Sequence, residues 1–287
     1  MDAHAVNRDP GAVAAPVPQP GAGARVVNVA DLTRRFGEIV AVDRATLHVE
    51  RGEIFGLIGR NGAGKSTLIK MLTTLLPPSG GSAQVAGFDI VRQPGDVRRA
   101  IGYVPQLLSA DGELTGYENL LLSARLYLLP RAERTRRIDE SLAMMGLQDV
   151  RDRLVGTYSG GMIRRLEIAQ SALHRPRVIF MDEPTIGLDP TGRHTVWGHV
   201  RTLQQQFGTS IVLTTHQMEE ADALCDRIGV IHAGHVVAVG TPQELKARVG
   251  PGATLDDVFA ALTGARIDPR GDYRHVREER RGASEHG

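Results

Sequence analysis

The sequence predicts an α/β fold, and three observations support that prediction. Between Arg25 and about Gly250, short apolar runs typical of buried strands alternate with helical patterns. A glycine-rich segment, Gly59–Ser66, lies between an apolar run and a helical pattern. Another apolar run, Val178–Met181, ends in two carboxylates. Alternating strands and helices favour a sheet with helices packed on its faces.

The predicted strands are apolar and β-branched runs bounded by turn residues. We expect them at Ala45–Val49, Glu53–Ile58, Ile101–Val104, Arg177–Met181, Ser210–Thr214, Arg227–Ile231 and His235–Val239. The last two are joined by Ala233-Gly234, which predicts that they pair.

The helical patterns are concentrated in two places. A helix over Lys65–Leu75 is expected to stop before a Pro-Pro pair, because proline cannot continue a helix. From Leu114 to about Leu173 the pattern is almost wholly helical, with helices over Tyr117–Leu129 and Arg131–Met145 separated by a proline. This stretch predicts a helical insert in an otherwise strand–helix domain.

Composition and charge restrict the class of protein. Hydrophobic residues make up 41% and charged residues 23%, as in ordinary soluble globular proteins. The formal net charge of +1 provides no strong field to recruit nucleic acid, so no nucleic-acid partner is expected. The single cysteine, Cys225, excludes an internal disulfide framework and a Cys-rich metal site. No stretch approaches the ~18 consecutive apolar residues of a membrane span, so the chain itself is not expected to cross a membrane.

Three segments are expected along the chain. Residues 1–24 are rich in Ala, Pro and Gly, which predicts a disordered leader. Residues 25–250 form the main domain. Residues 251–287 are expected to be a short C-terminal extension and a charged tail, whose last 23 residues carry 6 Arg and 5 acidic residues.

The segment Gly59–Ser66 matches the pattern G-x-x-x-x-G-K-[ST] in the strand-to-helix context that the pattern requires. Its glycines let the backbone curl so that N–H groups point at phosphates, and the helix N-terminus adds partial positive charge. Lys65 can reach the outer phosphates, and the Ser66 hydroxyl can hold Mg²⁺. The predicted nucleotide-binding residues are Gly59, Arg60, Asn61, Gly62, Ala63, Gly64, Lys65, Ser66 and Thr67. The alternative is an incidental glycine-rich turn.

The two carboxylates after Val178–Met181 lie where a buried strand meets a loop. Asp182 can hold Mg²⁺ through water, and Glu183, one residue further, can polarise an attacking water. Solvated acids at a strand end are the alternative, which the neighbouring phosphate loop makes less attractive.

Ser159-Gly160-Gly161 begins an amphipathic helix with apolar positions at Ile163, Leu166, Ala169 and Leu173. Serine is a favourable N-cap, and two glycines allow a phosphate to approach closely. A simple capped helix would explain this run taken alone. Its position before the Asp182 strand favours a second phosphate contact, which cannot serve the chain's own nucleotide and therefore indicates a two-chain ATPase.

Three further residues are ambiguous by themselves. His216 follows a buried strand, where a ring N–H can contact a γ-phosphate or make a structural hydrogen bond. Gln106 follows the Ile101–Val104 strand, and Phe36 can stack on a base or fill the core. They gain significance only from the other motifs.

Together these residues resemble the ATP-binding cassette (ABC) family over roughly residues 26–250. Six motifs occur in the order of that family: Walker A at Gly59–Thr67, the Q-loop residue at Gln106, the signature at Tyr158–Met162, Walker B at Val178–Glu183, the D-loop at Gly187–Asp189 and the switch histidine at His216. Phe36, 23 residues before Gly59, matches the aromatic residue that stacks on adenine.

The resemblance implies a P-loop NTPase core (a mixed sheet with flanking helices), an antiparallel β subdomain and a helical signature subdomain at about 107–173. It implies ATP hydrolysis by Lys65, Gln106, Glu183 and His216, with Mg²⁺ held by Ser66, Gln106 and Asp182. It also implies a head-to-tail dimer, in which ATP bound to one copy is covered by residues of the second copy. Those residues are Ser159, Gly160, Gly161, Met162 and Asp189. The helical insert would press on a separate integral membrane permease at the cytoplasmic face of the membrane.

Within the family, the chain is most similar to daunorubicin-resistance-type drug exporters, on the basis of Tyr158–Met162, Leu114–Leu120 and Thr254–Phe259. Tyr158 and Met162 depart from the common Leu and Gln, and Arg60 from a common Pro. An importer ATPase, or an ABC ATPase acting on ribosomes or DNA, is the alternative. A nucleotide kinase would leave the Ser159–Gly161 helix and Glu183 without a task.

Overall fold

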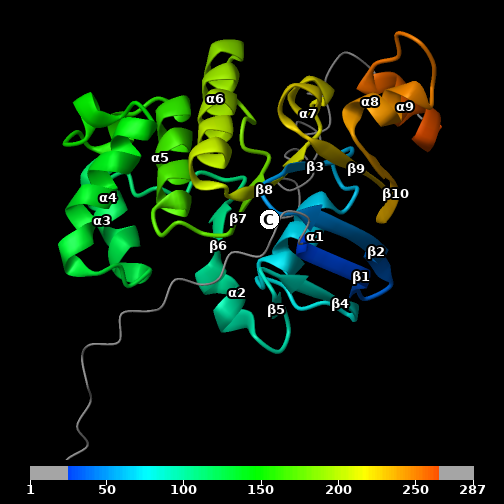
Figure 1. The fold of residues 1–287 in the computed structure, drawn as a ribbon, viewed down its shortest axis with the longest axis horizontal. Coiled ribbons are helices and arrows are strands. Elements are labelled where there is room, and N and C mark those ends of the chain that lie inside the picture. Colours follow the sequence, from blue (N-terminus) through cyan, green and yellow to red (C-terminus); the bar gives the residue numbers. More distant parts are fainter. Residues whose placement is uncertain (1–24, 265–287) are drawn as a thin grey trace, which may run out of the picture.

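The computed structural model describes residues 25–264, and a six-stranded sheet forms its centre (Figure 1). The strand order is β10-β9-β3-β8-β7-β6, and the five strands from β9 to β6 are parallel. Only β10 runs antiparallel to its neighbour. The strands are β3 (Ile54–Ile58), β6 (Ile101–Val104), β7 (Val178–Asp182), β8 (Ser210–Thr215), β9 (Arg227–His232) and β10 (His235–Gly240).

A second, antiparallel sheet has the order β2-β1-β4-β5. Its strands are β1 (Arg25–Phe36), β2 (Ile39–Glu50), β4 (Gly80–Val85) and β5 (Phe88–Asp89). Helix α1 (Lys65–Leu72) contacts β2 and β4 on one side and β7 of the central sheet on the other. Its buried face, which includes Leu68 and Leu72, therefore joins the two sheets in one hydrophobic core.

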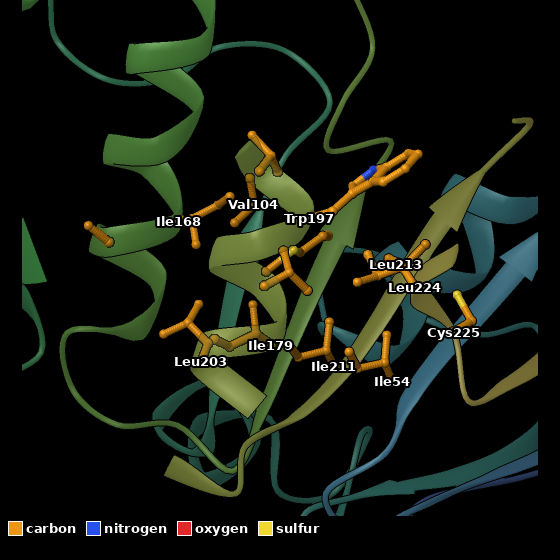
Figure 2. Close-up of a cluster of buried hydrophobic side chains, with 14 of the residues drawn as sticks. Ile54, Val104, Ile168, Ile179, Trp197, Leu203, Ile211, Leu213, Leu224 and Cys225 are labelled. Carbon is orange, nitrogen blue, oxygen red and sulfur yellow. The ribbon is translucent and has the colours of Figure 1, made fainter. Parts of the chain in front are cut away.

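The opposite face of the central sheet is covered by helices. They include α5 (Gly160–Ala172), α6 (Pro190–Phe207) and α7 (Met218–Leu224). Because successive side chains of a strand point to opposite faces, Ile179 and Met181 of β7 pack under these helices while Val178 and Phe180 pack toward α1. Figure 2 shows part of this core, with Leu203 of α6 beside Ile179 of β7, and Ile211 of β8 beside Ile54 of β3.

Helices α3 (Gly116–Leu126), α4 (Arg131–Met144) and α5 form a helical subdomain at one end of the molecule (Figure 1). Thr115 and Glu118 form a reciprocal capping box that starts α3. Three shorter α-helices, α2 (Pro94–Ala100), α8 (Pro242–Ala247) and α9 (Leu255–Thr263), and two 3-10 helices, η1 (Gln148–Val150) and η2 (Val155–Thr157), complete the described chain. Within residues 25–264, none of the helices has the length and apolar character needed to cross a bilayer.

The predicted fold class, with its core, antiparallel subdomain and helical subdomain, is confirmed. Two predicted helices are too long. Helix α1 ends at Leu72 rather than Leu75, because Thr74 has a φ of 62°. Helix α3 ends at Leu126 rather than Leu129, where Leu128 has a φ of 56° and Pro130 disfavours helical backbone at the residue before it.

The boundaries of the predicted strands differ by small amounts, apart from β2, which starts at Ile39, six residues before the predicted Ala45. Strands β1, β4 and β5 of the antiparallel sheet have no counterpart among the predicted strands. The predicted leader, residues 1–24, and the charged tail from Ala265 lie outside the described residues.

Candidate active site

The predicted site residues come together at one edge of the central sheet. Parallel strands end at the same edge, so the segments that follow β3, β6, β7 and β8 are neighbours. Gly59–Ser66 follows β3, Gln106 follows β6, Glu183 follows β7, and His216 follows β8. Because β8 lies between β3 and β7, the glycine-rich loop faces the carboxylates across one strand.

The glycines of the loop are required by the backbone. Gly62 and Gly64 have φ values of 78° and 107°, in the region that favours glycine. A Cβ on Gly64 would lie 2.4 Å from the carbonyl oxygen of Ala41, and one on Gly59 would lie 2.4 Å from that of Ile231. The curled conformation places Lys65 at the start of α1, next to the loop.

The Lys65 side chain is buried and folds back onto the loop. Its Nζ donates to the carbonyl oxygens of Gly59 (2.8 Å) and Arg60 (3.1 Å). The same nitrogen lies 3.3 Å from Oε1 of Glu183. Burial lowers the pKa of Lys65, and the negative charges of Glu183 and Asp182 oppose that shift. The ammonium group is therefore held at the mouth of the loop by oxygen atoms.

Asp182, at the end of β7, connects the first turn of α1 to the neighbouring strand β8. Its Oδ1 accepts hydrogen bonds from the hydroxyl of Ser66 (2.9 Å) and from that of Thr214 (2.6 Å). A hydroxyl and a carboxylate oxygen at this separation form the kind of donor pair that Mg²⁺ uses, with water and phosphate as its other ligands. The residues present therefore fit a magnesium ion at this point.

Glu183 is held by its backbone and by both neighbours of its carboxylate. It has a φ of 49°, which is unfavourable for a residue other than glycine. Its N–H donates to the hydroxyl (2.9 Å) and the carbonyl oxygen (3.1 Å) of Thr214. Its Oε2 lies 3.2 Å from Nδ1 of His216. Burial raises the pKa of Glu183, but His216 and Lys65 together outweigh burial and hold the pKa below its usual value.

Lys65, Ser66 and Glu183 line a cavity of about 220 Å³, whereas Asp182 lies behind Ser66 and is not part of the lining. The lining consists of Ala41, Asn61, Gly62, Gly64, Lys65, Ser66, Thr67, Gln106 and Glu183. His216 reaches this group through Glu183, and Arg60 contributes its carbonyl oxygen while its side chain is exposed. Phe36 is not part of the lining. It is 45% exposed, and the guanidinium of Arg34 lies 4.6 Å from the centre of its ring.

Ser159, Gly160 and Gly161 belong to a different cavity, of about 430 Å³, whose lining also includes Gly187, Leu188 and Asp189. Ser159 is the N-cap of α5, as predicted, and accepts from the N–H of Met162 at 3.3 Å. The side chain of Met162 packs against the hydrophobic core instead. A Cβ on Gly160 or Gly161 would meet nothing nearer than Leu188, at 3.9 and 4.0 Å. This surface is open and is separate from the Lys65 cavity.

Sequence reasoning missed two residues of the site. Thr214 bonds both Asp182 and Glu183, and its signal was a polar residue at the end of an apolar strand, directly before Thr215-His216. Arg164 donates to the carbonyl oxygen of Gln106 at 2.8 Å. Its one local signal is Glu167, three residues further along the same helix, whose Oε2 lies 3.0 Å from Nη1 of Arg164. Its other partners are backbone oxygens far away along the chain, which no sequence pattern marks.

Comparison with known proteins identifies the family. Residues 42–186 match the family model described as "ABC transporter". The chain belongs to the ABC transporter family. This ABC ATPase is 47% identical over 226 residues to the daunorubicin/doxorubicin resistance ATP-binding protein DrrA of Streptomyces peucetius, covering 79% of this chain and 68% of that protein. It is 45% identical to the doxorubicin resistance ATP-binding protein DrrA of Mycobacterium tuberculosis strain H37Rv, over 78% of this chain and 68% of that protein.

Solved structures agree with this assignment. An ATP-binding subunit of an ABC transporter matches this ABC ATPase with a TM-score of 0.74 and 33% identity, over 83% of this chain and 99% of that chain. Subunit cbiO1 of Clostridium perfringens, part of the ABC transporter complex cbiONQ, matches with a TM-score of 0.70 and 29% identity, over 78% and 91% of the two chains. The predicted family, P-loop NTPase fold and ATPase activity are thereby confirmed.

Proposed function

We propose that this ABC ATPase works as a head-to-tail dimer that drives export of a drug-like or antibiotic-like compound through a separate membrane permease. The observation that carries the dimer is the separation of the two cavities. The Lys65 cavity holds buried charged groups that contact one another, whereas the Ser159–Gly161 cavity offers an N-cap, small residues, the side chain of Arg165 and room. A second copy would present its Ser159–Gly161 turn, together with Met162 and Asp189, to the nucleotide at the Lys65 cavity.

Within the Lys65 cavity, each residue has a proposed task. The backbone of Gly59–Thr67 cradles the phosphates of ATP, and Lys65 exchanges its loop carbonyl contacts for phosphate oxygens. Phe36 stacks on the adenine. Ser66, Gln106 and Asp182 would hold Mg²⁺, which supplies charge neutralisation for the phosphates when bound.

Glu183 is the proposed base that accepts a proton from the attacking water. Its lowered pKa keeps the carboxylate ionised at neutral pH, and its contacts with His216 and Thr214 hold it in place. The proposed task of His216 is to contact the γ-phosphate, which is supported by its 3.2 Å contact with Glu183 and by a side chain that is 38% exposed. These tasks require positioning and electrostatic stabilisation, which is the general character of phosphoryl transfer.

The direction of transport and the cargo class rest on similarity. The relatives that match over most of both chains carry names of daunorubicin and doxorubicin resistance, at 45–47% identity. Exposed leucines at the C-terminal end of α3 offer an apolar surface for a permease at the cytoplasmic face of the membrane, since Leu126 is 73% and Leu128 82% exposed. Leu107, in the loop after β6, is 81% exposed.

The test is Glu183→Gln in the purified full-length chain. Because general-base catalysis contributes about 10²- to 10⁴-fold, we expect phosphate release to fall by at least about 100-fold. Binding of a fluorescent ATP analogue should remain, and ATP should convert the variant from monomer to dimer on gel filtration. Glu219→Gln, at an exposed residue of α7, is the matched control and should hydrolyse ATP normally. Normal hydrolysis by Glu183→Gln would contradict the assignment of the base.

Export is tested in cells that contain the chain with its permease. Lys65→Ala should raise accumulation of daunorubicin to the level of cells without the transporter. Unchanged accumulation across a panel of anthracyclines and other antibiotics would contradict drug export while leaving the ATPase assignment intact.

A further inference from the structure

Helix α5 lies along the segment Ile101–Ser109, which contains β6 and Gln106. Just beyond the C-terminal end of the helix, Nε2 of His174 lies 3.0 Å from the carbonyl oxygen of Ile101. One turn back, a Cβ on Gly102 would come within 2.3 Å of the carbonyl oxygen of Ser171, so helix and strand are in direct backbone contact. Toward the N-terminal end of the helix, the contact between α5 and this segment is made by two charged side chains, Arg164 and Glu167.

The side chain of Arg164 is buried and hydrogen-bonds the main chain at Pro105 and Gln106. It is only 2% exposed. Nη1 donates to the carbonyl oxygen of Pro105 at 2.7 Å, and Nη2 donates to that of Gln106 at 2.8 Å. The planar fork of a guanidinium can hold two adjacent carbonyl oxygens in one fixed geometry.

Glu167, one turn further along α5, completes this arrangement. Its side chain is also 2% exposed, and its Oε2 lies 3.0 Å from Nη1 of Arg164. Its Oε1 accepts from the N–H of Ser109 and, at 3.0 Å, from the Ser109 hydroxyl. The two charged residues therefore hold the loop after β6 at both ends, at Pro105-Gln106 and at Ser109.

The energetics of burial favour a geometric role for this pair. A buried ion pair gains little stability over apolar side chains of similar volume, because both charges lose their hydration. Burial lowers the pKa of Arg164, and the carboxylates of Glu167 and Asp182 oppose that shift. What apolar side chains cannot supply is donors for the two carbonyl oxygens that set the position of Gln106, whose side chain lines the Lys65 cavity.

We propose that Arg164, held by Glu167, is a positioning residue that fixes the main chain of Gln106 to the helix that begins at Ser159. Gln106 serves the chain's own nucleotide, while Ser159 contacts the nucleotide of the second copy. Movement of α5 on that second nucleotide is therefore transmitted to Gln106 through Arg164, which couples the two sites. This inference rests on the proposed function, because it requires the composite sites of the dimer.

The experiment measures ATP hydrolysis and ATP binding separately in the full-length chain. Arg164→Gln should lower kcat at least tenfold, whereas the Kd for a fluorescent ATP analogue should change less than twofold, because Arg164 does not contact Gly59–Thr67. Arg164→Lys should restore part of kcat, since an ammonium group can keep one of the two carbonyl bonds. Hydrogen exchange of residues 105–109 should quicken in Arg164→Gln.

Gln170→Ala is the matched control on the same helix. Gln170 Nε2 donates to the carbonyl oxygen of Asn119 (3.3 Å) and the hydroxyl of Ser123 (3.2 Å), so it ties α5 to α3 only. It should keep kcat within twofold and leave exchange of residues 105–109 unchanged. Equal effects of Arg164→Gln and Gln170→Ala, or a parallel loss of binding and kcat in Arg164→Gln, would overturn the inference.

Two further outcomes remain decisive. If Arg164→Gln does not fold, Arg164→Lys and Glu167→Gln replace it: lowered kcat at unchanged Kd supports the inference, and wild-type kcat overturns it. If Glu183→Gln abolishes hydrolysis while the Arg164 variants hydrolyse normally, this inference alone fails. Normal hydrolysis by Glu183→Gln would instead contradict the proposed base.

Discussion

The Lys65 cavity and the Ser159–Gly161 cavity differ in what their groups already contact. In the first, the ammonium of Lys65 meets Glu183 at 3.3 Å, and the hydroxyl of Ser66 donates to Asp182 at 2.9 Å. In the second, the lining consists of the first turn of a helix, small residues around Asp189 and one arginine, Arg165. The first cavity holds charge that is balanced within the chain, and the second presents a helix start, small residues and the positive charge of Arg165 to something outside it.

This difference indicates that the two cavities have different roles in hydrolysis. Acid, base and cation-binding groups need mutual positioning to fractions of an ångström, which one rigid sheet edge provides. A closing surface needs room for a phosphate and backbone donors, which a glycine-rich helix start provides. Substitutions that add volume should therefore change different quantities at the two cavities: stability and ATP binding at the first, and turnover at the second.

The largest effect is expected from adding one methyl group to a glycine of each cavity. Gly64→Ala combines a φ of 107° with a Cβ 2.4 Å from the carbonyl oxygen of Ala41, so strain and overpacking should cost about 2–5 kcal/mol and prevent ATP binding by the monomer. Gly161→Ala has a nearest neighbour at 4.0 Å, so the stability of the monomer should change by less than about 1 kcal/mol.

The same pair of variants distinguishes binding from turnover. Gly161→Ala should keep the Kd for ATP of the monomer but lower kcat, because the added methyl group lies on the surface that we propose closes on the second copy's nucleotide. Urea unfolding, equilibrium binding and phosphate release measure the three quantities. Equal losses of ATP binding in both variants would remove the distinction between the cavities.

The next effect concerns the pH dependence of folding stability, which we expect to depend on His174 and to leave ATP binding unchanged. His174 stacks on Tyr127 with ring centres 3.7 Å apart, and burial lowers its pKa to about 4. The unfolded chain binds this proton near pH 6.5, so stability is complete above that pH and is lost as the pH falls toward 4. The full loss should be about 3 kcal/mol.

Urea unfolding of the wild type and of His174→Gln between pH 4 and 7 measures this contribution. The variant should lose some stability at every pH because the ring stack is gone, but its stability should fall less steeply toward pH 4. Parallel curves for the two proteins would show that His174 is not the group that titrates. Neither cavity includes His174 in its lining, so the ATP Kd at pH 7 should not change.

The smallest effect is expected at Thr214, which supports the Lys65 cavity from within. Thr214→Val removes the hydroxyl that donates to Asp182 and accepts from the N–H of Glu183, which should cost about 1–3 kcal/mol of stability. It should also lower kcat more than it changes the ATP Kd. Thr214→Ser keeps the hydroxyl and serves as the control. A Thr214→Val variant with wild-type kcat would indicate that Ser66 alone holds Asp182 in place.

Much of the site could be predicted because its signals are local. Gly59–Ser66 is one continuous pattern, and Asp182-Glu183 directly follows an apolar run, so both were placed by neighbouring residues alone. Phe36 is the weakest case, since its predicted place beside adenine rests on spacing while the structure leaves its ring half exposed under Arg34. The partner of β2 was missed because pairing across an antiparallel sheet leaves little trace in either strand.

The sequence by itself determined the family, the α/β class and the order of the motifs along the chain. Those properties depend on backbone conformation and side-chain periodicity, which residues within one turn or strand dictate. Only the tertiary structure decided that β8 lies between β3 and β7. It also decided that Thr214 hydrogen-bonds both Asp182 and Glu183, and that Arg164 hydrogen-bonds the main chain of Gln106. These contacts join residues far apart along the chain. The carbonyl oxygens of Pro105 and Gln106 that Arg164 contacts are backbone atoms, which every residue carries and no sequence pattern marks.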